Sequence, residues 1–154
     1  MLKKIFIIIL LVLATALAFL IMAVGYDSFQ THNTKAVDQK EIYVADKKIV
    51  VDIADKLDEQ TLGLSYRKSM SENTGMLFIF PQPGSMGFWM KNMNFSLDFI
   101  WIDSNNKIIS IAKNISPKTY PKIFYSPLPV KYVLEVNAGW SDRNGIKNGD
   151  LVIY

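Results

Sequence analysis

Few side chains in this chain are suited to nucleophilic or metal chemistry. The 154 residues include no cysteine and a single histidine, His32, which lies in a polar stretch near the N-terminus. A Ser–His or Cys–His nucleophile pair therefore lacks its base or its thiol in the remainder of the chain. Zinc sites built from histidines or thiolates are excluded for the same reason. We expect no metal and no other cofactor.

Paired carboxylates are the next chemistry to consider. Glycan cleavage uses one protonated and one ionised carboxyl group about 5–10 Å apart, and Asp98 and Glu135 are the candidates. Asp98 begins an apolar run, and Glu135 lies within an alternating segment. A structural interpretation is also open, in which Asp98 caps the start of a strand and Glu135 lies on a solvated strand face.

Arg67 is one of only two arginines in a chain that otherwise uses lysine. A planar guanidinium can hold a carboxylate through two parallel hydrogen bonds, which a lysine cannot do. We therefore expect Arg67 to contact Asp98 or Glu135. This pair either braces the fold or presents a charged pocket to an anionic ligand.

The segment 86–92, MGFWMKN, turns from apolar to polar at Lys91 and Asn92. In a strand, its even-numbered apolar residues would face one side and Trp89 and Lys91 the other. Trp89 would then form an aromatic shelf edged by a cation, which suits a sugar ring or a peptide. The alternative is that Trp89 fills a core or plugs an edge.

Methionines gather around the same segment. Thioether clusters can hold Cu(I) outside the cytoplasm, but methionine also fills irregular core gaps and packs on aromatic rings. We interpret the cluster as a packing layer and keep copper binding as the alternative. Its members are Met70, Met76, Met86, Met90 and Met93.

The N-terminus has the pattern of a membrane anchor. Residues 5–24 carry no charge and no proline, and a helix of that length spans about 30 Å, the hydrocarbon thickness of a bilayer. Lys3 and Lys4 precede this run and Asp27 follows it, so the positive-inside rule places the N-terminus in the cytoplasm. We predict an anchor over residues 1–25 that crosses the cytoplasmic membrane once. A cleaved signal peptide is the alternative, although its apolar region would usually be shorter.

Beyond the anchor, residues 26–40 are polar and without periodicity, which predicts a linker. We predict that residues 41–154 form one exported domain. Residues 48–54 alternate as in a half-buried strand, and residues 76–80 and 97–103 are apolar on both faces. Helical patterns are confined to two short segments, so we predict a single compact, mainly β sandwich or barrel with one or two short helices.

The net charge argues against nucleic acid as a partner. The 17 basic side chains include Lys3 and Lys4 of the anchor, so that 15 basic side chains stand against 14 acidic ones beyond residue 25. A nucleic-acid binder requires a concentrated basic face, and no segment supplies one.

Several blocks occur together in the predicted domain, in the order GLSYR (63–67), GMLFIF (75–80), FWMKN (88–92), LDFIWID (97–103), VLEVNAG (133–139) and NGD (148–150). In this respect the chain resembles, over about residues 41–154, the bacterial and archaeal family named domain of unknown function 192. The resemblance implies a compact β-rich domain that is often exported behind a signal or an anchor, and it implies no particular activity, substrate or cofactor. The matching polar positions are Arg67, Lys91, Asn92, Asp98, Glu135 and Asp150. Met93 stands where the family commonly has threonine, so a role for that hydroxyl is absent here.

These observations predict a membrane-tethered extracytoplasmic binding or accessory module rather than an enzyme. Its ligand is expected to be a glycan, a peptide or an envelope protein. The alternatives are a cell-envelope hydrolase that uses Asp98 and Glu135, and a docking protein that contacts a membrane complex through a β edge or residues 115–129. The candidate ligand-binding residues are Trp89, Lys91, Asn92, Arg67, Asp98 and Glu135.

Overall fold

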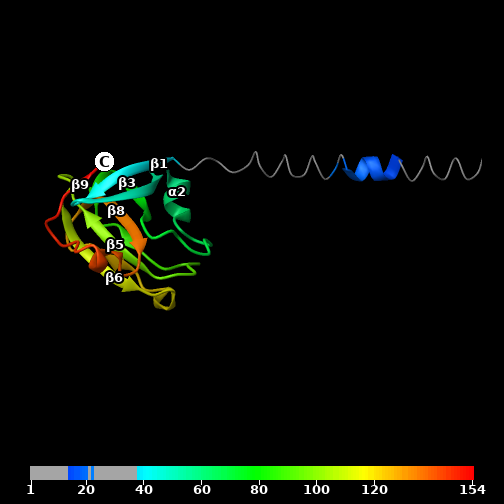
Figure 1. The fold of residues 1–154 in the computed structure, drawn as a ribbon. Helices are drawn as coiled ribbons and strands as arrows, with labels where there is room; N and C mark the ends of the chain where they lie inside the picture. Colours follow the sequence, from blue (N-terminus) through cyan, green and yellow to red (C-terminus); the bar gives the residue numbers. More distant parts are fainter. Residues whose placement is uncertain (1–13, 21, 23–37) are drawn as a thin grey trace, which may run out of the picture. The chain divides into compact units, whose positions relative to one another are not determined.

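The computed structural model describes residues 14–20, 22 and 38–154 (Figure 1). Residues 14–20 and 22 are helical, and none of the helices in the described ranges is long and apolar enough to cross a membrane. Most of the predicted anchor (1–25) and linker (26–40) lies outside the described residues. The first strand begins at Gln39, so the last two residues of the predicted linker belong to the domain.

The domain is mainly β, as predicted, with only short helices among its described residues. Its strands are β1 (Gln39–Val44), β2 (Lys47–Ala54), β3 (Thr74–Gly84), β4 (Gly87–Phe88), β5 (Leu97–Ile102), β6 (Ile108–Ile115), β7 (Phe124–Tyr125), β8 (Val130–Asn137) and β9 (Val152–Ile153). The helices are α2 (Leu57–Leu62), a 3-10 turn η1 (Pro117–Thr119) and α3 (Trp140–Arg143). The two α-helices of the domain, α2 and α3, are short, as predicted.

Seven strands form one sheet in the order β6-β5-β8-β3-β2-β1-β9, and β4 pairs with β7 in a separate ribbon. All neighbours in the large sheet are antiparallel except β2 and β3, which run parallel. The sheet curls into a half-barrel, which Figure 1 shows from the side. The prediction of a mainly β domain with few short helices is confirmed, and the architecture is a curled half-barrel instead of the predicted sandwich or barrel.

The C-terminal segment connects the two edges of the curled sheet. On one side β9 pairs with β1, and Val44 lies opposite Val152. On the other side Leu151 forms a bridge with Lys107, just before β6. The backbone N–H of Val152 also donates to the carbonyl oxygen of Asn106 at 2.9 Å. This segment thus covers the open end of the apolar interior.

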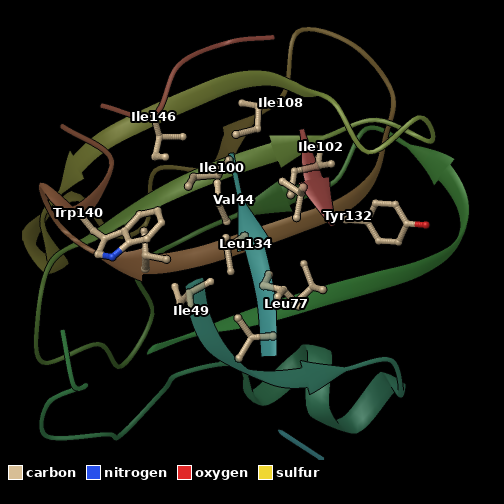
Figure 2. Close-up of a cluster of buried hydrophobic side chains, with 14 of the residues drawn as sticks. Val44, Ile49, Leu77, Ile100, Ile102, Ile108, Tyr132, Leu134, Trp140 and Ile146 are labelled. Atoms are coloured by element: carbon tan, nitrogen blue, oxygen red, sulfur yellow. The ribbon is translucent and has the colours of Figure 1, made fainter. Parts of the chain in front are cut away.

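The enclosed face of the sheet carries a core that we call the inner core. Residues at alternate positions of β2 contribute Ile49, Val51 and Ile53, which confirms the predicted alternation. Figure 2 shows side chains from several strands converging on this core, among them Leu77 and Leu134. The full inner core is Ile42, Val44, Ile49, Val51, Ile53, Leu77, Ile100, Ile102, Ile108, Tyr132, Leu134, Val136, Trp140, Ile146 and Val152.

The opposite face carries a second core, rich in aromatic residues, which we call the outer core. It consists of Ala54, Leu64, Met76, Phe78, Phe88, Met90, Leu97, Phe99, Trp101, Val130 and Val133. The remaining methionines of the cluster, Met70, Met86 and Met93, pack against it. All five methionines therefore serve packing, as the sequence predicted. Because β3 and β5 contribute to both cores, their apolar runs have no polar face.

The approach of β3 to β8 depends on one glycine. A Cβ atom at Gly75 would lie 2.6 Å from the backbone oxygen of Glu135, which is closer than non-bonded atoms can approach. Any other residue would therefore push the two central strands apart. These two strands carry the floor of the site described next.

Candidate functional site

A pocket of about 150 Å³ opens on the outer-core side of the sheet. Its floor is the sheet itself, where Phe78 of β3 and Glu135 of β8 line it. Its walls come from the end of α2 and from the chain around β4. The lining residues are Gln60, Thr61, Leu62, Gly63, Leu64, Ser65, Phe78, Phe80, Met86, Gly87, Phe88, Trp89, Lys91, Met93 and Glu135.

Two loops that form the pocket walls hold each other in place. The Ser65 hydroxyl donates to the carbonyl oxygen of Lys91 at 3.1 Å. The backbone N–H of Tyr66 donates to the carbonyl oxygen of Asn92 at 2.9 Å. The Asn92 amide donates in return to the Tyr66 hydroxyl at 2.7 Å. Tyr66 and Asn92 both have positive φ, 66° and 56°. A positive φ costs conformational energy in residues other than glycine. The hydrogen bonds between the two loops hold this backbone in place.

Trp89 and Lys91 form the predicted shelf at the mouth of the pocket. Trp89 is 48 % exposed, whereas its neighbours Phe88 and Met90 are buried. The Lys91 ammonium lies 5.7 Å from the centre of the Trp89 ring, within the range of a cation–π contact. The Tyr120 ring meets Trp89 edge-on at 6.2 Å. The alternation predicted for segment 86–92 is confirmed, and Trp89 is not a core residue.

Beside the pocket lies a wider and more open groove of about 790 Å³. The groove and the pocket share Thr61, Leu62, Ser65, Trp89 and Lys91. The groove adds Leu57, Asp58, Tyr66 and Asn92, and so it contains the predicted site residue Asn92. The Trp89 shelf therefore faces a small enclosed space on one side and an open surface on the other.

Glu135 is the buried ionisable group of the pocket. It is 5 % exposed, so the interpretation that it lies on a solvated strand face is wrong. Burial raises the pKa of its carboxyl to about 8, and the nearby Arg67 charge only partly opposes this shift. None of the described residues donates a hydrogen bond to the carboxyl group. Glu135 is therefore largely a neutral acid at pH 7, with a proton available to a ligand.

Arg67 is paired, but not with the predicted carboxylates. Its Nη1 atom donates to Oδ2 of Asp52 at 2.6 Å, and the Gln39 amide donates to Oδ1 of Asp52 at 2.8 Å. Asp52 lies in register with Met76, and Met76 with Glu135. The two carboxyl groups thus occupy one row on the same face of the sheet. Arg67 forms its hydrogen bond with Asp52, and its charge acts on Glu135 only through a longer-range electrostatic interaction.

Asp98 has a structural role on the other face. It pairs with Val136 of β8, whereas Glu135 pairs with Phe99, so Asp98 and Glu135 point to opposite sides of the sheet. Asp98 accepts backbone hydrogen bonds from Asn114, Gly139 and Ser141 at 2.8–3.1 Å. These bonds join β6 and the start of α3 to β5. The two carboxyl groups form no catalytic pair, because the sheet separates them.

Of the six predicted site residues, the structure brings Trp89, Lys91 and Glu135 together in the pocket and places Asn92 in the adjoining groove. Arg67 and Asp98 are not among the residues lining either space. The phenylalanines of the wall, Phe78, Phe80 and Phe88, were not predicted, because apolar strand residues resemble ordinary core residues in a sequence. The partner of Arg67, Asp52, was not predicted either, although an acidic residue within an apolar strand could have indicated it.

The comparisons with known proteins agree with this fold. A family model described as "Uncharacterized ACR", domain of unknown function 192, matches residues 40–154. No curated protein sequence matches the chain significantly.

Two crystal structures are similar to this domain. One is a protein of Sinorhizobium meliloti named as a candidate transcription regulator, with a TM-score of 0.71 and 33 % identity over 75 % of this chain and 93 % of that one. The other is a protein of unknown function from Novosphingobium aromaticivorans, with a TM-score of 0.73 and 29 % identity over 80 % of this chain and 90 % of that one. Through residues 40–154, the chain belongs to the family of domain of unknown function 192.

Proposed function

We propose that the protein is a membrane-tethered binding module that holds a ligand in the pocket between Trp89 and Glu135. The observation that carries this proposal is the buried acid of Glu135, which lines the pocket and has no hydrogen-bond partner among the described residues. Glu135 is 5 % exposed and lines the pocket, so a ligand that enters the pocket can accept a hydrogen bond from this acid.

The tether is proposed from the sequence. The uncharged run of residues 5–24 has the length of a membrane span, and the lysines before it favour a cytoplasmic N-terminus. The domain would then lie on the extracytoplasmic side of the cytoplasmic membrane. There it would meet cell-envelope ligands such as a glycan, a peptide or part of an envelope protein.

Binding is favoured over hydrolysis by the arrangement of the acids. The pocket lining contains one carboxyl group, Glu135, whereas glycoside cleavage uses two carboxyl groups that face the same bond. Asp52 is on the same face but is held by Arg67 and does not line the pocket. A hydrolase therefore stands as the weaker alternative.

Docking to a membrane complex is a second candidate function. Within residues 115–129, four large apolar side chains are exposed: Tyr120, Ile123, Tyr125 and Leu128. Exposed apolar residues that gather in one segment are a common feature of protein interfaces. If this is the function, substitution of Tyr125 and Leu128 would abolish binding of the partner, and substitution of Trp89 would leave that binding unchanged.

The proposal is tested by purifying the full chain from native membranes and identifying its bound small molecules by mass spectrometry after denaturing extraction. We expect a species that is present with the wild type and absent with Trp89→Ala. Tyr43→Ala is the matched control, because Tyr43 is an exposed aromatic residue, 45 % accessible, outside the pocket lining. Identical extracts from the wild type and Trp89→Ala would refute the proposal. Protease accessibility in spheroplasts tests the location of the domain.

A further inference from the structure

Three polar side chains of the pocket lining already donate hydrogen bonds to the backbone. The Gln60 amide nitrogen donates to the carbonyl oxygens of Ala54 and Ile79, at 3.2 and 2.8 Å. The Thr61 hydroxyl donates to the Leu57 carbonyl oxygen, and the Ser65 hydroxyl is bonded to the backbone of the opposite wall. The ionisable residues of the lining are Glu135 and Lys91.

These two residues lie at opposite ends of the space. Glu135 projects from the sheet at the floor and is almost fully buried. Lys91 lies beside exposed Trp89 at the mouth, where its ammonium group is 5.7 Å from the centre of the Trp89 ring. The pocket thus presents a carboxyl group at its base and a positive charge at its entrance.

Between them, one part of the lining is apolar, and the space has the size of a ring. Phe78, Phe80 and Phe88 line it together with Met86 and Met93. A cavity of about 150 Å³ lined by aliphatic and aromatic side chains is large enough to bind benzene.

We propose that the pocket binds a small organic anion of three parts: a ring-sized apolar body, a hydrogen-bond acceptor oxygen at its inserted end, and a carboxylate at its outer end. This inference rests on the proposed binding function and narrows its ligand class. The Glu135 acid donates to the inserted oxygen, Trp89 covers the body, and the Lys91 ammonium pairs with the carboxylate.

Three matched probes separate these contributions. 4-Methoxyphenylacetate carries all three parts, 4-ethylphenylacetate lacks the acceptor oxygen, and 4-methoxyphenylacetamide lacks the charge. Each is titrated into the full chain in lipid nanodiscs at pH 6.5 by isothermal titration calorimetry. We expect the first probe to bind most tightly, with losses of about tenfold for the second and about fivefold for the third.

Variants assign each loss to a residue. Glu135→Gln keeps a neutral donor and is expected to retain affinity for 4-methoxyphenylacetate within about threefold, whereas Glu135→Leu should lose about tenfold. Lys91→Met should lower affinity for the anion to that for the amide and leave the affinity for the amide unchanged. Lys47→Met is the control, because Lys47 lies on β2 outside the pocket lining.

The outcomes distinguish this inference from the proposed function. Equal binding of all three probes, or loss of anion preference that does not depend on Lys91, would overturn the ligand class. If no probe binds but native extracts still contain a Trp89-dependent species, the ligand class is wrong and the binding function stands. If no Trp89-dependent species exists and no probe binds, both fail.

Discussion

Asp52 and Glu135 face the same side of the sheet in one row, with Met76 between them, yet only Asp52 has an ion-pair partner. The Arg67 guanidinium contacts Asp52 at 2.6 Å, and the Gln39 amide supports the same carboxylate. No residue in the described part of the chain forms an ion pair or a hydrogen bond with the Glu135 carboxyl group, and burial raises its pKa to about 8. Two similar acids on neighbouring parts of a sheet are therefore placed in different electrostatic environments by one arginine.

The first prediction concerns stability and pH. Because the pKa of Glu135 is raised from 4.5 to about 8 in the folded state, its contribution to stability is fully present below about pH 4.5. That contribution should be lost as pH rises to about 8. The slope contributed by this group can reach about 1.4 kcal/mol per pH unit.

Urea unfolding of the wild type and Glu135→Gln across pH 5–9 measures this contribution. The variant, which cannot ionise at this position, should lose less stability than the wild type as pH rises. Parallel pH profiles for the two proteins would show that Glu135 ionises normally in the folded state.

The second prediction concerns Arg67. Arg67→Met keeps much of the aliphatic stem but leaves Asp52, which is 6 % exposed, without its cation. We expect a loss of about 1–3 kcal/mol in the free energy of unfolding. The pKa of Glu135 should also rise, because the Arg67 charge lowers it, and carboxyl ¹³C NMR titration would detect that change.

The exposed pair between Arg143 and Glu72 provides the comparison, with both side chains at least half exposed. Glu72→Gln should cost less than about 1 kcal/mol, as is usual for surface ion pairs. An Arg67→Met variant as stable as Glu72→Gln would contradict a stabilising role for the Asp52 pair.

The third prediction separates Asp98 from the pocket. Asp98→Asn weakens three backbone hydrogen bonds to a fully buried carboxylate, so we expect a loss of about 2–3 kcal/mol in stability. Ligand affinity of the folded variant should be unchanged, because Asp98 faces the inner core. Asp142→Asn, at an exposed acid, is the control for stability, and reduced affinity in folded Asp98→Asn would place Asp98 in the site after all.

The fourth prediction concerns Gly75. Gly75→Ala places a methyl group 2.6 Å from the Glu135 carbonyl oxygen, and we expect a cost of about 3 kcal/mol as the strands separate. Gly145→Ala meets no atom within 4 Å but has φ +67°, so only backbone strain of about 1 kcal/mol is expected. Chemical denaturation of both variants gives the ranking, and equal costs would mean that the β3–β8 contact is not tight.

Patterns within single segments were sufficient for much of the fold. The alternation of Ile49, Val51 and Ile53 identified a strand with one apolar face, and the period of segment 86–92 placed Trp89 and Lys91 on the same side, leaving open whether Trp89 was buried or exposed. Both inferences need only the two-residue period of an extended chain, which does not depend on the rest of the molecule.

Relations between distant segments were beyond that reasoning. Arg67 pairs with Asp52 because the loop after α2 returns across β2, which lies parallel to β3. This pairing could not be predicted, because the periodicity of a segment does not specify the order of strands in the sheet. Glu135 lies on a strand face that looks solvated in the sequence, since Lys131 shares it. The face is covered by the chain around α2 and β4, a layer that no local pattern of β8 reveals.

The three tryptophans occupy three different surroundings. Trp140 lies in the inner core, Trp101 in the outer core, and Trp89 half in water at the pocket mouth. An indole in an apolar interior fluoresces at shorter wavelength than one in contact with water. Intrinsic tryptophan fluorescence therefore reports on both cores and on the pocket mouth. Its emission wavelength can follow unfolding of the domain and ligand binding in the pocket without an added dye.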